Sequence, residues 1–162
     1  MNPDPSVVSD EDNVLQDLVR HVCEIESASY FSNRIGATRT EMRQLVSNFQ
    51  KALLEHLRIA PRGVEWKMEY RPNAEMLDSI DIFGKSKTHF IAIEIDAYRA
   101  DQAAKKFVSR MALLPPDKPI YLLSLCNPGT ERMTKPECIK YFNYCKTLAL
   151  RLGNHCAGLI IQ

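Results

Sequence analysis

The sequence predicts a single α/β domain in which a mixed central β-sheet is flanked by helices. Short apolar runs of strand length alternate with longer segments whose apolar residues follow the helical period. The chain has 162 residues, 45% of them hydrophobic and 25% charged, which suits one globular domain with a sizeable core. Because no repeat or linker divides the chain, we expect residues 10–162 to form this domain. Residues 1–9, rich in Pro, Asp and Ser, are expected to be disordered.

A helix is expected near the N-terminus. Ser9 and Asp12 have the spacing of a capping box, and the apolar residues that follow have helical period. This pattern predicts a helix that begins at this box and fades near Ser27.

A loop and a longer helix should come next. Residues 30–37 contain a glycine and an arginine, which is typical of a loop. Thr38 and Glu41 form a second capping box in front of a long apolar stripe. We therefore expect a long helix that Pro61 ends.

The rest of the chain alternates strands and helices. The expected strands cover residues 64–70, 79–83, 90–96, 120–125 and 157–161. The near-continuous apolar character of residues 90–96 predicts a central strand. Helices are expected around residues 100–111 and from Pro136 to Gly153, where a left-handed glycine should close the last helix. The predicted order is α-α-β-β-β-α-β-α-β.

Three carboxylates interrupt two of these apolar strands. Asp81 lies in the second strand, and Glu94 and Asp96 lie in the third. A buried strand normally excludes charge, so several acids there usually hold a metal ion. Glu94 and Asp96 are two residues apart and therefore face the same side of the sheet. The pattern predicts a Mg²⁺ or Mn²⁺ site that could activate a water molecule for hydrolysis.

A simpler interpretation of the same acids stays open. Asp81 and Asp96 would then mark the ends of their strands, and Glu94 would pair with Arg99 or with a lysine. Under this interpretation no metal is needed.

The arrangement resembles the PD-(D/E)XK nuclease superfamily. An acid in one strand, an acid-x-acid strand and a following helix lie within an α-β-β-β-α-β order over roughly residues 38–125. The resemblance implies a restriction-endonuclease-like core with an extra N-terminal helix, and metal-dependent hydrolysis of DNA. Asp81 and Glu94 correspond to the metal-binding acids of the family. Asp96 stands where the family usually has lysine.

The helix after these strands offers a substitute for the missing lysine. Gln102 and Lys106 are four residues apart and so share one helix face. The segment from Gln102 loosely resembles the Gln-x-x-x-aromatic motif of the family, with the aromatic residue one place late. Lys106 is the first choice for a migrated lysine and Lys105 the second, although both also fit a solvent-facing charge. The family often adds an acid from its first helix, for which Glu41 and Glu55 are equal candidates.

The net charge of +1 does not itself indicate nucleic acid, but the basic residues are clustered. One cluster contains Arg34, Arg39 and Arg43, and another follows the acidic strands. We expect Arg99, Lys105 and Arg110 to bind phosphates, although solvated charged faces would look the same. Because the chain leaves little room for a separate reading domain, a homodimer or a partner subunit should supply any sequence specificity.

Several other classes of protein fit poorly. The five cysteines lack a Cys-x-x-Cys pair and the four histidines are scattered, so no zinc site is expected from them. The Gly-Lys-Ser after Phe83 lacks the earlier glycine and the following helix of a phosphate-binding loop. No apolar run approaches a membrane span and the N-terminus has no secretory leader pattern, so a cytoplasmic protein without membrane contact is expected.

Three functional hypotheses remain. The first is a Mg²⁺-dependent endonuclease that hydrolyses DNA, with metal on Asp81, Glu94 and Asp96, and with Lys106 and Gln102 near the scissile phosphate. The second is a catalytically inactive nuclease-fold module that binds nucleic acid or a protein partner, because Asp96 replaces lysine. The third is a small-molecule or structural α/β protein whose acids only form salt bridges.

Overall fold

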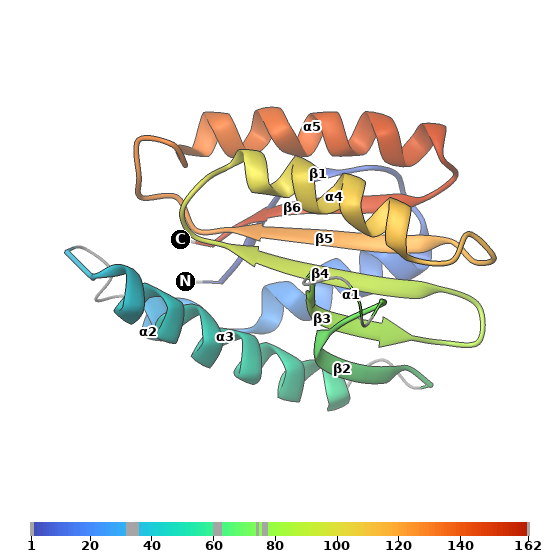
Figure 1. Cartoon of the computed structure of the whole chain (residues 1–162), viewed down its shortest axis with the longest axis horizontal. Coiled ribbons are helices and arrows are strands. Elements are labelled where there is room, and N and C mark those ends of the chain that lie inside the picture. Colours follow the sequence, from blue (N-terminus) through green and yellow to red (C-terminus); the bar gives the residue numbers. More distant parts are fainter. Residues whose placement is uncertain (1, 32–35, 60–62, 74, 76–77, 162) are drawn as a thin grey trace.

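A six-stranded mixed sheet forms the centre of the molecule, which is a computed structural model describing residues 2–31, 36–59, 63–73, 75 and 78–161 (Figure 1). The strands are β1 (Asp4–Val8), β2 (Glu65–Tyr70), β3 (Ile80–Lys85), β4 (Phe90–Asp96), β5 (Ile120–Cys126) and β6 (His155–Ile160). The helices are α1 (Asn13–Glu24), α2 (Ala28–Phe31), α3 (Arg39–Ile59), α4 (Asp101–Leu113) and α5 (Lys135–Arg151). Among the described residues, no helix has both the length and the apolar character needed to cross a bilayer.

The strand order across the sheet is β1-β6-β5-β4-β3-β2. β4, β5 and β6 run parallel and are joined through α4 and α5, whereas β2 and β3 form antiparallel pairs on one side. β4 therefore occupies the centre, as its apolar sequence predicts. The predicted single α/β domain with a mixed sheet is confirmed.

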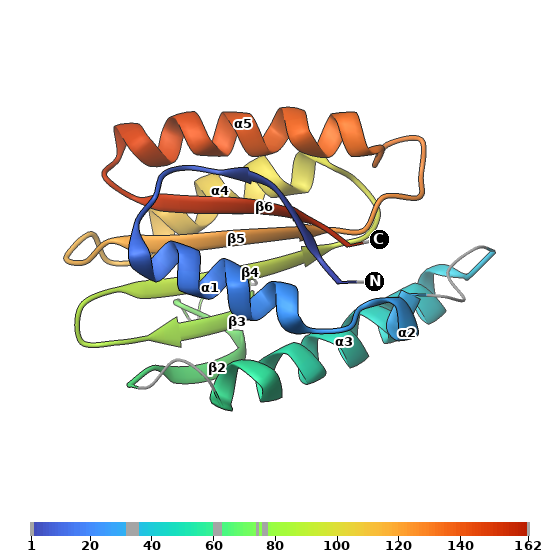
Figure 2. The same cartoon turned by 180° about the vertical axis from the view of Figure 1, so that it is seen from behind.

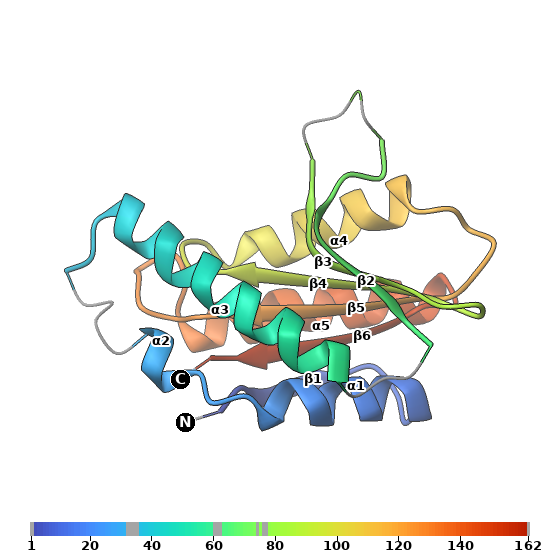
Figure 3. The ribbon, with the colours of Figure 1, turned by 90° about the horizontal axis from the view of Figure 1, so that it is seen from below.

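Helices cover both faces of this sheet. α1 and α3 pack on one face, and α4 and α5 pack on the other (Figures 2 and 3). Along β4, Ile91, Ile93 and Ile95 point to α1 and α3, while Phe90 and Ala92 point to α4 and α5. Since side chains alternate along a strand, Glu94 and Asp96 must also face α4 and α5.

Residues 4–8 correct the expectation of a disordered N-terminus. They form β1, which pairs antiparallel with the edge of β6, and Val7 is buried in the core. Pro5 is tolerated because β1 is an edge strand with a register irregularity between Pro5 and Val7. The unpaired edge of β6 and the burial of Val7 outweigh the loop-like composition of the segment.

The helix starts are confirmed in one case and shifted in the other. Thr38 and Glu41 form the predicted capping box, because each backbone N–H donates to the side chain of the other, at 2.7 and 3.3 Å. The first helix is capped by Asp12, not by Ser9: Asp12 Oδ1 accepts from the next turn, while Ser9 Oγ accepts from the backbone of Cys156 in β6.

Smaller differences concern the connections. The loop expected from residue 30 begins with the last residues of the short helix α2, and Arg34 lies outside the described residues. Pro61, the expected end of the long helix, also lies outside them, and α3 is described to Ile59. Gly153 closes α5 with φ of 67°, the left-handed conformation predicted for it.

One glycine fixes how closely α5 approaches the sheet. A Cβ atom at Gly158 of β6 would lie 2.1 Å from Phe142 Cγ, a separation that no side chain tolerates. We expect Gly158→Ala to lower the free energy of unfolding by about 2–3 kcal/mol, measured by urea unfolding. If the clash is the cause, combining it with Phe142→Leu should cost less than the sum of the two single variants. Simple additivity would contradict this explanation.

Candidate active site

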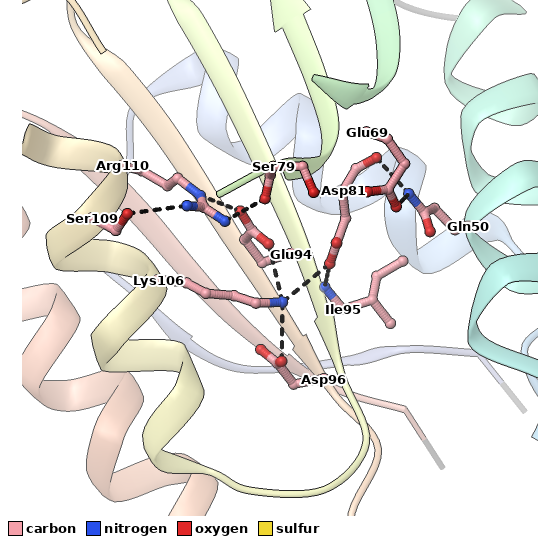
Figure 4. Close-up of polar contacts among 10 residues, drawn as sticks. All are labelled: Gln50, Glu69, Ser79, Asp81, Glu94, Ile95, Asp96, Lys106, Ser109 and Arg110. Carbon is pink, nitrogen blue, oxygen red and sulfur yellow. Dashed lines mark hydrogen bonds and ion pairs between the residues drawn. The ribbon is translucent and has the colours of Figure 1, made fainter. Parts of the chain in front are cut away.

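β3 and β4 separate where their acidic residues lie. The two strands pair from Lys85 and Phe90 as far as Ile82 and Ile93, and the ladder stops there. Asp81 directly precedes Ile82 in β3 and so lies just beyond the last pair. Its Oδ2 accepts a hydrogen bond of 2.7 Å from the backbone N–H of Ile95 (Figure 4). The carboxylate thus replaces a lost ladder bond and is held in the gap between the strands.

Lys106 of α4 joins the three carboxylates. Its Nζ lies 3.2 Å from Asp81 Oδ2, 3.1 Å from Glu94 Oε2 and 3.0 Å from Asp96 Oδ1 (Figure 4). The structure therefore brings together all four of these residues singled out in the sequence. Lys105 instead forms an exposed ion pair with Asp101 and turns away from this cluster.

Arg110 is the second cation of the cluster. Its Nε donates to Glu94 Oε1 at 2.5 Å, and its other nitrogens donate to the backbone oxygen of Ser79 and the hydroxyl of Ser109. Arg110 is 3% exposed and Glu94 is fully buried. The expectation that Arg110 binds phosphate is wrong, because a buried guanidinium with all three partners in the protein cannot reach a ligand. Arg99 does not pair with Glu94 but with Asp101.

Burial sets the protonation states of the cluster. Burial raises the pKa of Glu94 to about 7, against the attraction of Lys106 and Arg110. Burial also raises the pKa of Asp96, again opposed by Lys106. Burial alone would lower the pKa of Lys106, but the three carboxylates together raise it well above its usual range. Lys106 is therefore an ammonium donor and not a general base.

The oxygen atoms fit a hard divalent cation. Three carboxylates face two cationic side chains, which leaves one net negative charge when all are ionised. Asp96 Oδ2 is buried without a hydrogen-bond partner in the described part of the chain, and Glu94 Oε2 has only its ion pair with Lys106. Free carboxylate oxygens and residual negative charge are what Mg²⁺ or Mn²⁺ requires.

A cleft of about 850 Å³ opens above Asp81 and Asp96. One wall comes from the first half of α3, and the other from the segment after β4 and the loop after β5. Glu94 and Lys106 lie behind the acids that line the cleft. Four arginines line it, namely Arg39, Arg43, Arg99 and Arg132.

These arginines differ in their availability. Arg39, Arg43 and Arg132 are exposed and form no ion pair within the ranges that the structure describes. Arg99 also lines the cleft, but it donates to both oxygens of Asp101, at 2.9 and 2.7 Å. Gln102 lines the cleft, whereas Lys105 does not. The basic surface at the site therefore comes mainly from α3.

Two residues of the site were not found in the sequence. Gln50 of α3 donates to the backbone oxygen of Asp81 at 2.6 Å and to Glu69 Oε1 at 2.9 Å (Figure 4). Glu69 lies opposite Asp81 in β2, has φ of 49°, and accepts from Ser79 Oγ at 2.8 Å. The sign of Gln50 in the sequence is its position on the otherwise apolar face of the helix, where a polar side chain needs a buried partner.

The helix acids considered from the family resemblance lie elsewhere. Glu41 caps its own helix, and Glu55 forms an exposed ion pair with Arg58 at 2.6 Å. Neither residue lines the cleft. The residue of α3 that reaches Asp81 is Gln50.

The buried pair of Arg110 and Glu94 should dominate the stability of this region. We expect Arg110→Met to lower the free energy of unfolding by about 3–5 kcal/mol, because a buried carboxylate loses a partner. The exposed pair of Arg99 gives a matched control, and Arg99→Met should cost less than about 1 kcal/mol. Chemical unfolding of both variants measures this. Equal, small losses would show that Arg110 does not balance the charge of Glu94.

No protein-family model, curated protein or solved structure matches this chain. What the site can do chemically therefore follows from its own residues. They place a cluster of carboxylates and one ammonium beside a cleft lined with arginines.

Proposed function

We propose that this chain is a nuclease of the PD-(D/E)XK type that hydrolyses DNA phosphodiester bonds with Mg²⁺ or Mn²⁺. The observation that carries the proposal is the convergence of four residues, Asp81 and Asp96 at an arginine-lined cleft and Glu94 and Lys106 directly behind them. The element order α3-β2-β3-β4-α4-β5, with β3 and β4 parting at the acids, also suits that family.

The chain's own groups have distinct roles in this proposal. Asp81, Glu94 and Asp96 would hold the metal, which when bound would activate water and stabilise charge on the phosphate. Lys106 is an ammonium group whose Nζ contacts all three carboxylates, so in this proposal it holds the acids in place instead of removing a proton. The Ile95 N–H of β4 holds the Asp81 carboxylate, and Gln50 of α3 holds the Asp81 backbone oxygen. Gln102 contacts the substrate from the cleft wall.

The arginines give the cleft its affinity for a polyanion. Arg39 and Arg43 rise from α3, and Arg132 faces them from the other wall, all three without an internal ion pair in the described regions. Tyr98, 39% exposed, also lines the cleft and donates from its hydroxyl to the backbone oxygen of Arg39. Such a cleft binds phosphates without reading sequence. We infer that a homodimer or a partner subunit, acting in the cytoplasm, supplies further specificity.

A second candidate is an inactive nuclease-fold module that binds nucleic acid or a protein partner. The observation in its favour is that Lys106 Nζ already lies within 3.2 Å of all three carboxylates, where it neutralises part of their charge. Asp96 in place of lysine points the same way. Such a module keeps the arginine-lined cleft but gains nothing from a divalent metal.

Cleavage of supercoiled plasmid with Mg²⁺ or Mn²⁺ distinguishes these two candidates. We expect the wild type to nick the plasmid, and Asp81→Asn, Glu94→Gln and Lys106→Met each to lower the rate at least about 100-fold. Lys105→Met is the matched control, because this lysine lies next in sequence but outside the cluster, and it should stay active. A wild type that neither cuts nor gains thermal stability from either metal would favour the inactive module.

Binding to the cleft has its own test. The triple variant Arg39→Gln, Arg43→Gln, Arg132→Gln should bind a short labelled DNA duplex more weakly, measured by anisotropy without divalent metal. Its affinity should also depend less on salt, with a slope in log salt reduced by about 3. Arg151→Gln, an exposed arginine of α5 outside the cleft, is the control. An unchanged slope in the triple variant would rule out this cleft as the DNA surface.

A further inference from the structure

Two histidines that are far apart in the sequence meet on the opposite face of the sheet from Lys106. His21 and Glu24 lie one turn apart on α1, and His56 lies on α3. His21 Nδ1 is 3.2 Å from Glu24 Oε2, and His56 Nε2 is 3.6 Å from the same oxygen. Each of the three residues offers one ligand atom, and these atoms lie within 4.8 Å of one another. The cluster shares no residue with the cleft.

The hydrogen bonds of this cluster are incomplete. His56 Nε2 is buried and has no hydrogen-bond partner in the described part of the chain, although the ring as a whole is 31% exposed. Its separation from Glu24 Oε2 is too long for a hydrogen bond, and His21 already contacts that oxygen. A buried ring nitrogen without a partner is uncommon in proteins. A bound metal ion could accept its lone pair.

We propose that His21 Nδ1, Glu24 Oε2 and His56 Nε2 form a binding site for Zn²⁺ or a similar borderline transition metal. Bonds of about 2.0–2.1 Å in a tetrahedron place neighbouring ligand atoms about 3.3 Å apart. The two separations from Glu24 Oε2 are already close to that value. Closing the third needs only side-chain rotation, since all three side chains are partly exposed at 19–50%. Water would complete the coordination.

The chemistry of these ligands separates this site from the candidate active site. Two imidazole nitrogens and one carboxylate favour Zn²⁺, Co²⁺ or Ni²⁺, whereas Mg²⁺ prefers oxygen ligands alone. The sequence led us to expect no zinc site from the scattered histidines. Folding brings His21 and His56 together, with a carboxylate as the third ligand and no cysteine.

A metal at this position would link α1 to α3. These two helices touch each other and together cover one face of the sheet. α3 also carries Gln50 and Arg43, so the helix that forms a wall of the cleft would be fixed to its neighbour. This inference does not depend on the proposed nuclease function. The alternative is that the three side chains form only a partly exposed ion-pair cluster. In that case the protein should not respond to Zn²⁺.

Thermal unfolding of the full chain, first stripped with a chelator and then supplied with one metal at a time, tests the site. We expect Zn²⁺ or Co²⁺ to raise Tm by about 5 °C at saturation, because binding to the folded state adds to its stability. Co²⁺ should also show a visible absorption band that saturates at one ion per chain. Mg²⁺ should produce neither effect at this site.

Variants assign the response to these residues. His56→Gln and Glu24→Gln should each abolish the Zn²⁺ shift and the Co²⁺ band, and the exposed Glu24 should be replaceable without loss of folding. His89→Gln, a partly buried histidine of another segment, and Cys23→Ser, a neighbour on α1, should keep both responses. Asp81→Asn should keep them too, which separates this inference from the nuclease proposal. A wild type indifferent to Zn²⁺, or a His56→Gln variant with an unchanged response, would overturn it.

Discussion

The placement of α4 depends on one electrostatic constraint. Three carboxylates on β3 and β4 face the helical layer, and carboxylates in a low-dielectric interior need cations close by. Lys106 and Arg110 lie four residues apart on α4 and so present both cations to the same patch of sheet. The α4 helix, which connects β4 to β5, must therefore pack with this face against the acids. The apolar residues around Phe107 pack beside it. Arrangements of α4 that turned either cation to solvent would leave a buried acid unpaired.

Local periodicity was enough to predict much of this site. The two-residue spacing of Glu94 and Asp96 placed them on one face, and the four-residue spacing of Gln102 and Lys106 placed these two together on α4. The same helical rule applies to Arg110, one turn beyond Lys106. Arginines are usually exposed, but the buried charge of Glu94 draws Arg110 into the interior.

The features that the sequence could not predict all depend on distant pairing. β1 is a strand because β6, at the other end of the chain, offers an unpaired edge, and nothing in Pro3-Asp4-Pro5 indicates this. Gln50 reaches the backbone of Asp81 across 31 positions, and His21 meets His56 across two helices. Spacing rules describe one element at a time. Contacts between elements appear only when the packing of α1 and α3 on the sheet is known.

The two proposed cation sites are divided by the sheet and use different donor atoms. The face under α4 offers carboxylate oxygens, with one net negative charge when all three acids are ionised, and the proposed ion there is a hard cation. The other face offers two imidazoles at the junction of α1 and α3, where a softer cation would bind more tightly and hold the two helices together. α3 is the element that relates them, because Gln50 contacts Asp81 and His56 lies nearly two turns further along the same helix. A cation that fixed α3 to α1 would also fix the wall from which Arg39 and Arg43 face the cleft.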